Sequence, residues 1–248
     1  MKTAYGFFSF TEVTDPAEHK SYNEWHQLDH LPEQFPLPGI VYGQRWVSTP
    51  ACRAVRAVSE PDLDPIHYVT CYLMAEPIDE TLRDFFDLGA RLHELDRFHL
   101  HRHAHLTGPF GVGHALAAPR VFVSAEAVPF RAHRGLYVVV EEPRAEADAG
   151  HAEYEAWLAD EHEPALVAVP GVAGVWTFSS PAEMTSRRWT QGNRRITVCW
   201  LDDEPLAVAA RIAPIEAVRR SRFDAVSHVV FAGPFETITP WEWDWFDG

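Results

Sequence analysis

The strongest constraint on the fold is a phrase that the sequence contains twice. The stretch YNEWHQLDHLPEQFPLPG begins at Tyr22, and YEAWLADEHEPALVAVPG begins at Tyr154. Both contain Y-x-x-W, an acidic residue followed by His, then x-Pro and a closing Pro-Gly. Self-similarity of this kind marks a structural unit that occurs twice in one chain.

Two further matches occur in the same order. TCYLMAEP pairs with VCWLDDEP, which sets Cys71 on Cys199, and RFHLHRHAHLTGPF pairs with RFDAVSHVVFAGPF, which sets His103 on His228. The spacing between partners shrinks along the chain, so the first half carries extra residues, which we expect in the loop ACRAVRAVSEPDLDP. The matches predict a first repeat over 1–125 and a second over 126–248, which ends in an aromatic C-terminal tail.

Each repeat shows the same order of elements. Stretches rich in β-branched and aromatic residues read as strands, and longer acidic or amphipathic stretches read as helices. The expected order is strand, helix, strand, strand, helix, strand, over 4–13, 15–35, 39–48, 66–75, 79–98 and 99–107, and again over 135–142, 151–169, 171–180, 195–203, 206–223 and 225–233. This is the split βαβ or ferredoxin-like unit. Because its sheet has helices on one face only, two fused copies can bury their bare faces together, which predicts an α+β fold closed into an α/β barrel.

Composition excludes several functions. The formal net charge is −15 and 46% of the residues are hydrophobic, which predicts a soluble globular protein with no nucleic-acid partner and no anionic membrane partner. No apolar run approaches the roughly 18 residues of a membrane helix. Three cysteines without a CxxC spacing indicate a reducing, cytoplasmic setting. We therefore expect a small molecule as the ligand.

The repeated phrase W-x(4)-H-x-P followed by Pro-Gly, inside a βαββαβ unit, resembles the dimeric α/β-barrel superfamily, and its EthD-like group most of all. The resemblance covers both halves. It implies a pocket between the sheet and the helices of each half. Members of this superfamily include cofactor-free monooxygenases, lactone isomerases, polyketide cyclases, and haem-dependent dehydratases and haem-degrading enzymes, so the resemblance implies a pocket rather than one reaction.

The first helix carries candidate site residues. At 100° per residue, Tyr22, Trp25 and Asp29 share one face, His26 lies beside them and His30 lies on the flank. A carboxylate on an aromatic face is costly to bury unpaired. We expect His30 to act as an acid or base and Asp29 to orient or bind. We expect substrate contacts from Tyr22, Trp25 and His26, and from His162 of the second repeat; an alternative is that the aromatic residues are only core.

The stretch HLHRHAHLT offers a partner for His30. In a strand, His99, His101, His103 and His105 would point to one side. A metal site, a catalytic pair and a solvated polar seam are all compatible with this pattern, and we expect no metal. We expect His103 to act as the second acid or base. His101 and the matching His228 are expected to bind substrate, and the histidine-rich first half is expected to be the working one.

The sequence contains no nucleotide-binding loop, no GxSxG and no HExxH. The leading expectation is therefore an enzyme that uses His/Asp acid–base chemistry, without a cofactor, on an aromatic or polyketide-like carbonyl compound. The reaction would be a cyclisation, an isomerisation, an elimination or a cofactor-free oxygenation. The alternatives are a haem enzyme, for which His93 is one candidate ligand, and a non-catalytic binding or accessory protein. Association into a homodimer is left open, and the tail PWEWDWFDG is expected to pack on the barrel.

Overall fold

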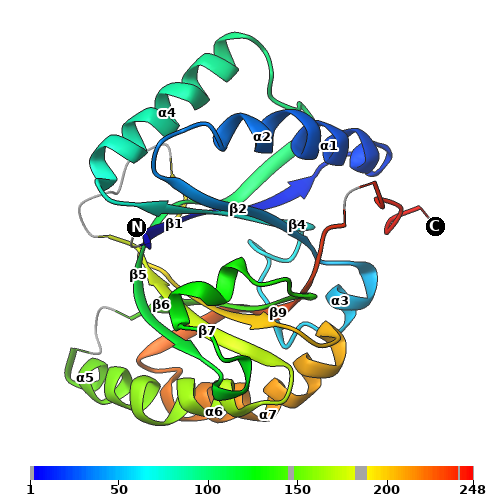
Figure 1. Cartoon of the computed structure of the whole chain (residues 1–248). Helices are drawn as coiled ribbons and strands as arrows, with labels where there is room; N and C mark the ends of the chain where they lie inside the picture. The colour runs from blue at the N-terminus through cyan, green and yellow to red at the C-terminus, as the bar shows by residue number, and fades with distance from the viewer. Residues whose placement is uncertain (1–2, 145–147, 182–188, 240, 248) are drawn as a thin grey trace.

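The computed structural model describes residues 3–144, 148–181, 189–239 and 241–247. Two helical layers enclose a β-barrel, one layer for each half of the chain (Figure 1). The first layer holds helices α1, α2 and α4, and the second holds α5, α6 and α7. The C-terminal tail leaves the second half and ends beside α1 of the first half.

Both halves follow the predicted element order. The first half contains β1 Thr3–Val13, α1 His19–Trp25, α2 Leu31–Gln34, β2 Ile40–Val47, β4 Tyr68–Ala75, α4 Ile78–Glu94 and β5 Arg102–Ala117. The second half contains β6 Gly135–Pro143, α5 Asp148–Trp157, α6 Glu163–Ala168, β7 Val172–Ser179, β8 Arg195–Leu201, α7 Pro205–Phe223 and β9 Ser227–Thr237. The expected insertion of the first half holds the short helix α3 Pro50–Ala54 and the strand β3 Val58–Ser59, which pairs with β9.

The two sheets join into one closed barrel, which confirms the predicted α+β fold. The strand order is β2-β4-β1-β5-β7-β8-β6-β9-β3, and all of the pairings are antiparallel. The long strand β5 pairs with β1 at one end and with β7 at the other, so it passes from one half to the other. On the opposite side, β2 pairs with β9 and closes the ring.

The barrel interior is the main hydrophobic core. Alternate residues of each strand point inward, among them Phe8, Phe10, Trp46 and Trp200, all at most 1% exposed. Burial of aromatic side chains of this size is the largest favourable contribution to folding that the sheet makes. The outward-facing alternate residues meet the helices, and the candidate site lies in that second layer.

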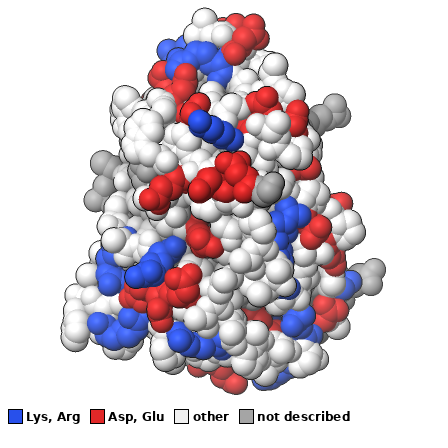
Figure 2. Space-filling model, turned by 90° about the vertical axis from the view of Figure 1, so that its right-hand side faces the viewer, with Lys and Arg blue, Asp and Glu red and all other residues white. Residues whose placement is uncertain are grey.

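The C-terminal tail packs on the first half, as expected. Trp243 is buried beside β2 and β4, and the Phe246 ring stacks on the His19 ring with the centroids 4.0 Å apart. Trp241 is 73% exposed. The tail therefore ties the end of the second half to helix α1. The face of the molecule in Figure 2 shows acidic and basic groups interspersed among uncharged residues.

One predicted match between the repeats is wrong by one residue. Cys71 pairs across the sheet with Phe8, an inward-facing residue, whereas Cys199 pairs with Tyr137, and the pKa of both Cys199 and Tyr137 responds to Glu216 of helix α7. Cys71 therefore faces the barrel interior and Cys199 faces the helices. The β-bulges between β2 and β4 and between β7 and β8 fall at corresponding residues only when Met74 is matched with Leu201, one residue away from the sequence match. The strands themselves correspond when Tyr72 is matched with Cys199.

Candidate active site

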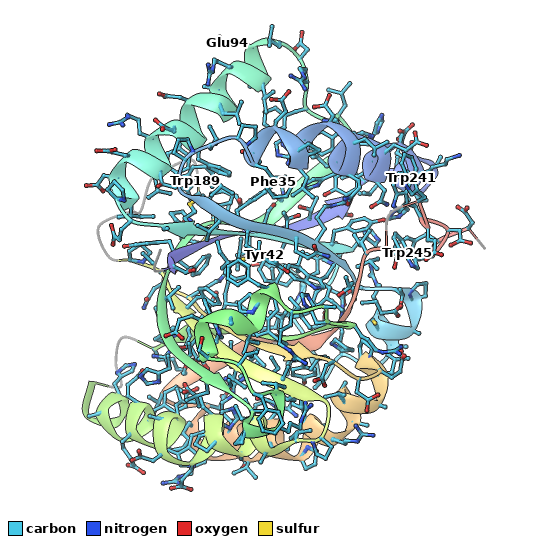
Figure 3. All side chains as sticks on the ribbon, viewed as in Figure 1. Phe35, Tyr42, Glu94, Trp189, Trp241 and Trp245 are labelled. Atoms are coloured by element: carbon cyan, nitrogen blue, oxygen red, sulfur yellow. The ribbon has the colours of Figure 1, made fainter. Side chains whose placement is uncertain are left out.

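A cavity of about 1000 Å³ lies in the first half, between the sheet and helices α1, α2 and α4. Aromatic rings form much of its wall, and hydroxyl, amide, imidazole and guanidinium groups lie among them, which suits a small molecule with both apolar and polar parts. Trp189, labelled in Figure 3, lines the side near the start of α4. The residues that line it in addition include Phe7, Tyr22, Trp25, His26, His30, Gln34, Thr70, Tyr72, Phe85, Phe86, Gly89, Phe98 and Arg102.

A wide turn in the first helix brings His30 to the cavity. The segment His26–His30 is a π-type turn, in which the Leu31 N–H donates to the His26 carbonyl five residues earlier. The extra residue in this turn rotates every later position. His30 consequently stacks on Trp25, five residues before it, with the ring centroids 4.8 Å apart. A regular helix would have left His30 on the flank, as the sequence analysis predicted.

Two histidines of the cavity wall, His26 and His30, are held neutral. Burial is the main cause that lowers the pKa of His30, to about 3, and the positive charge of Arg102 lowers it further. Burial likewise lowers the pKa of His26 well below its ordinary value. The His26 Nδ1 contacts the Tyr22 hydroxyl at 3.2 Å, while the His26 Nε2 and the His30 Nδ1 are buried without a partner among the described residues.

A guanidinium group also lines this cavity. Arg102 begins strand β5, and its guanidinium lies over the rings of Trp25 and Phe98, with distances of 5.5 and 4.8 Å to the ring centroids. No hydrogen bond or ion pair links it to another described side chain. Burial lowers the pKa of Arg102 from its ordinary value. Such cation–π contacts stabilise the guanidinium only in part, because they do not neutralise its charge.

Three further polar atoms of the cavity wall are unpartnered. The Gln34 Oε1, the Thr70 Oγ1 and the Tyr72 hydroxyl are buried, and none has a hydrogen-bond partner within the described part of the chain. Unsatisfied polar atoms cost about 1–3 kcal/mol each when they are shielded from water. Their concentration in one aromatic cavity indicates a site that binds a polar molecule or ordered water.

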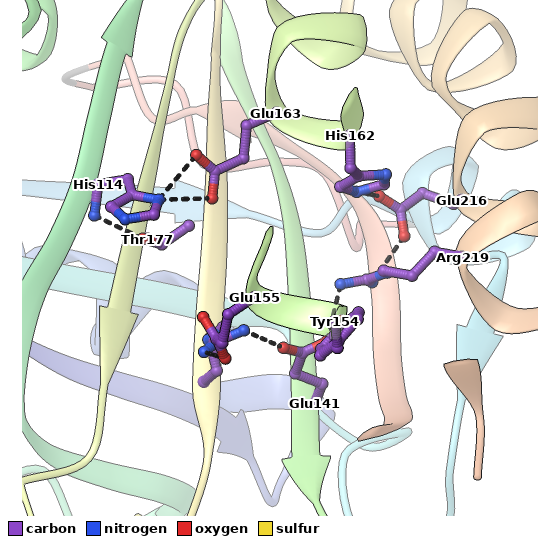
Figure 4. A network of polar contacts seen from close by, with 10 residues as sticks. His114, Glu141, Tyr154, Glu155, His162, Glu163, Thr177, Glu216 and Arg219 are labelled. Carbon is purple, nitrogen blue, oxygen red and sulfur yellow. Dashed lines mark hydrogen bonds and ion pairs between the residues drawn. The ribbon is translucent and has the colours of Figure 1, made fainter. Parts of the chain in front are cut away.

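The corresponding space of the second half is occupied by charged side chains (Figure 4). His162 Nε2 lies 3.1 Å from Glu216 Oε1, and Glu216 Oε2 lies 2.6 Å from the Arg219 guanidinium. Arg219 also donates to Glu141 Oε2 at 2.9 Å, and Tyr154 donates its hydroxyl proton to the same oxygen at 2.6 Å. His162, Glu216, Arg219, Glu141 and Tyr154 are called the second-half network below. All five are at most 2% exposed.

Contacts between each first-half or second-half glycine and its neighbouring helix show which first-half residue stands in place of Glu216. In both halves a glycine after the first helix packs on the second helix, Gly39 on Thr81 and Gly171 on Val208. Counting along each helix from this contact places Gly89 where Glu216 stands. A Cβ at Gly89 would have no described atom within 4 Å, since it would point into the cavity.

Strand register shows which first-half residue stands in place of the second acid, Glu141. The pairings of β1 with β4 and of β6 with β8 match Thr11 with Glu141. The first half thus keeps the tyrosine and the histidine of the repeated phrase, Tyr22 and His30, but lacks both carboxylates that hold their counterparts. The cavity exists because a glycine and a threonine stand where the second half has two glutamates.

The structure separates the predicted site residues into two groups. Tyr22, Trp25, His26 and His30 line the cavity together, as expected. The side chain of Asp29 does not, because the π-type turn directs it outward, where it accepts a hydrogen bond from Arg97 at 2.7 Å.

The histidines of the last strand do not reach the cavity. Strand β5 begins at Arg102, so His101 precedes it and is exposed, and the predicted row of four histidines on one strand face is wrong. His103 is exposed on the strand face opposite Arg102, with its ring 4.6 Å from that of His105. The predicted approach of His103 to His30 is therefore not observed.

The remaining predicted contacts lie in the second half or at the cavity mouth. His162 belongs to the second-half network, and His228 lies near the surface between Asp224 and Glu60, at 2.7 and 2.5 Å. Hydrogen bonds to these two acids are the main cause that raises the pKa of His228. His93 lines the cavity on its exposed side. Sequence alternation could have found Arg102, because it stands between two histidines and must face the other way.

Over the described part of the chain, no cluster of three or more His, Cys, Asp or Glu side chains has the geometry to hold a metal ion. The described helices likewise include none that is long and apolar enough to span a membrane.

Comparison by sequence finds no family profile and no curated protein that matches this chain. Comparison by structure finds several solved proteins over nearly the full length. A protein provisionally named chlorite dismutase superposes with a TM-score of 0.60 at 10% identity and covers 100% of this chain and 99% of its own.

Two others give a TM-score of 0.54. An anthrone oxidase-like protein is 13% identical, and a mutant chlorite dismutase from Candidatus Nitrospira defluvii, in complex with cyanide, is 14% identical; each covers 96% of this chain and 92% of its own. These likenesses concern the fold, at identities too low to transfer an activity. The chain thus shares the tandem ferredoxin-like, α/β-barrel fold of the chlorite dismutases and of the anthrone oxidase-like protein.

Proposed function

We propose that this protein is an enzyme that carries out proton transfer on a small aromatic or polyketide-like carbonyl compound in the cavity of the first half. The observation that carries the proposal is the difference between the halves. The second half fills the corresponding space with paired acids, arginine and histidine, although the His162 Nδ1 and the Tyr137 hydroxyl there have no described partner, whereas the first half leaves a cavity of about 1000 Å³ with unpartnered imidazole, amide and hydroxyl atoms.

The chemistry follows from the groups that face the cavity. A neutral imidazole can take a proton from a carbon next to a carbonyl group, and His30 presents an unpartnered ring nitrogen there. The electron pair left by the proton moves to the carbonyl oxygen, and the resulting enolate is stabilised by the positive Arg102. The enolate can then cyclise, eliminate a leaving group, be reprotonated elsewhere or react with oxygen. The surrounding aromatic residues exclude water and strengthen these electrostatic interactions.

The test begins with a thermal-shift screen of aromatic carbonyl compounds, followed by a turnover assay of the compounds that bind. His30→Gln is expected to reduce turnover by about 10²–10⁴-fold, which is the usual contribution of an acid–base group. His103→Gln is the matched control, since His103 is an exposed histidine outside the cavity. Unchanged turnover in His30→Gln would remove His30 from the mechanism. Ligands that bind and are never converted would favour the non-catalytic binding protein instead.

A haem enzyme is the second candidate. His30 has the donor chemistry of an axial ligand, because it is neutral and one of its ring nitrogens is bare, and His93 is a second donor at the mouth. A bound haem would supply redox chemistry at its iron. Axial histidines are usually held by a carboxylate or carbonyl at the other ring nitrogen, and no described residue holds His30 in this way, which ranks this candidate second. Haem reconstitution followed by absorption spectroscopy decides it: a stoichiometric Soret band that His30→Gln removes supports haem, and a bare protein spectrum excludes it.

A further inference from the structure

We propose that the first-half cavity binds its substrate as an organic anion, an aromatic carboxylate, and that Arg102 is the residue that recognises the negative charge. This inference rests on the proposed function and specifies its substrate class. The observation behind it is an imbalance of buried charge that occurs in one half of the chain and is absent from the other.

The second half balances its buried charges. Arg219 lies between two carboxylates, Glu141 and Glu216, and Arg195 makes ion pairs with Glu141, at 3.3 Å, and with Glu155. Both of these guanidinium groups, Arg219 and Arg195, therefore have acidic partners in direct contact. A buried charge in a protein is normally paired in this manner, since an isolated one is far more costly.

The first half contains two guanidinium groups that lack such partners. Arg102 lines the cavity, and Arg45 lies behind it, 1% exposed, where it donates to the Asn23 side-chain oxygen at 2.8 Å and lies 5.3 Å from the centre of the Tyr22 ring. Neither forms an ion pair with any described acid. Strand register matches Arg102 with Ser227 and Arg45 with Thr177, so both positive charges are specific to the half that has the cavity.

Nearby acids do not neutralise these cations. Glu94 is the one acidic residue among those that line the cavity, and it is exposed at the end of helix α4 (Figure 3). Asp29 and Glu33, on the outer side of the first helix, are both paired with Arg97, at 2.7 and 2.8 Å. The cavity interior is therefore positive in a chain whose formal net charge is −15. A ligand that brings its own carboxylate would complete the charge balance that Glu141 and Glu216 provide in the other half.

The shape of the site identifies the rest of the ligand. The Trp25 and Phe98 rings lie against the Arg102 guanidinium, and Phe7, Phe85 and Trp189 form an aromatic wall farther along the cavity. An aromatic ring system can stack there while its carboxylate meets the guanidinium. Inorganic phosphate would offer charge without ring contacts. An anion beside Arg102 also offsets the positive charge that holds down the pKa of His30, so binding would make that imidazole a stronger base.

The experiment is titration calorimetry with two probes of equal shape, 2-naphthoate and the neutral 2-naphthamide. We expect the wild-type protein to bind the acid about tenfold to a hundredfold more tightly than the amide, the usual effect of a charge-assisted hydrogen bond. Arg102→Gln should remove this preference, so that the acid binds no more tightly than the amide. Equal affinity for acid and amide in the wild type overturns the proposal, as does an acid preference that survives Arg102→Gln. Because calorimetry reads binding alone, the result stands whether or not any compound is turned over.

A second pair of variants tests the role of charge without relying on the folding of Arg102→Gln. Gly89→Glu introduces the carboxylate that Glu216 provides in the second half, and Gly89→Gln introduces a side chain of the same shape without charge. Binding of 2-naphthoate should fall in Gly89→Glu and persist in Gly89→Gln. Equal losses in both variants would attribute the effect to filled space and would contradict a role for charge. Binding of inorganic phosphate as tight as that of the naphthoate would contradict the aromatic part of the proposal.

Discussion

Removal of Arg219 should expose the dependence of the second half on its buried charges. Arg219 is 1% exposed and contacts Glu141 at 2.9 Å and Glu216 at 2.6 Å. At an effective dielectric constant of about 20, each contact is worth roughly 6 kcal/mol of Coulomb energy before desolvation is subtracted. Arg219→Met keeps the volume but leaves Glu216 with only the His162 imidazole and Glu141 with only Arg195, at 3.3 Å, and the Tyr154 hydroxyl. We expect the free energy of unfolding to fall by about 3–5 kcal/mol, as for other broken buried pairs.

Urea unfolding at pH 7 measures this loss, and two variants control it. Arg120→Met removes an arginine that is 43% exposed and paired with Asp202, so it should cost about 1 kcal/mol or less. The triple variant Glu141→Gln, Glu216→Gln, Arg219→Met removes the stranded charges and should recover part of the loss. A loss in Arg219→Met no larger than that in Arg120→Met would refute the reasoning, and so would a triple variant less stable than the single one.

The pH dependence gives an independent reading of the same network. Burial pushes the pKa of Glu216 up, but Arg219 and His162 outweigh burial and hold it below its ordinary value. A carboxyl with a lowered pKa stabilises the fold above the unfolded pKa, near 4.5, and this contribution is lost as the pH falls through the folded pKa. In Arg219→Met only His162 opposes burial, so we expect the pKa of Glu216 to rise, and protonation by acid should then cost the folded state less. The free energy of unfolding should therefore fall less steeply with acid near pH 5 in the variant than in the wild type, in which Glu216 adds to the loss.

Three further outcomes follow from the structure. Burial keeps His26 and His30 neutral in the folded state, with the pKa of His30 at about 3, so the unfolded chain binds protons first as the pH falls. The free energy of unfolding should therefore drop below pH 6.5 by about 1.4 kcal/mol per pH unit for each histidine, which urea unfolding from pH 7 to 5 would measure. Trp243→Ala should cost about 3–5 kcal/mol because this ring of the tail is buried against the first half, whereas Trp241→Ala, at an exposed ring, should cost less than about 0.5 kcal/mol by the same assay. Gly39→Ala should lower the melting temperature, since the backbone φ there is +96° and a Cβ would lie 2.0 Å from a side chain of helix α4; an unchanged melting temperature would show that the turn relaxes.

The repeat carried most of the information about the fold. Strand pairing confirms the sequence match between His103 and His228, because His103 pairs with Glu12 and His228 with Glu142 at corresponding places in the two sheets. The match between Cys71 and Cys199 was wrong, since a shift of one residue in a match moves every side chain of a strand to the other face. The letters that TCYLMAEP and VCWLDDEP share favour an alignment one residue away from the one that strand pairing shows. The predicted boundary at 125 and the EthD-like relationship stay predictions.

The site was only partly predictable for a related reason. Periodicity of 100° per residue placed Tyr22 and Trp25 correctly but failed after the π-type turn, where it exchanged the roles of Asp29 and His30. Nothing in the local sequence marks that turn, although it recurs at the same place in the second half, over Leu158–His162. The cavity was less predictable still, because it depends on two small residues on different elements, Gly89 and Thr11, at positions where the second half has glutamates.

Duplication explains why one chain can hold both arrangements. A cavity that leaves polar atoms and two guanidinium groups unbalanced, such as Arg45 and Arg102, lowers stability, and a single small unit has little stability to spare. The second copy of the unit fills the same space with paired charges, and the closed barrel and the tail bind the two copies into one structure. The first copy can then keep a binding site that it could not hold alone. On this reasoning the histidine of the repeated phrase has a different role in each half: His162 is fixed by Glu216, and His30 is left free for a ligand.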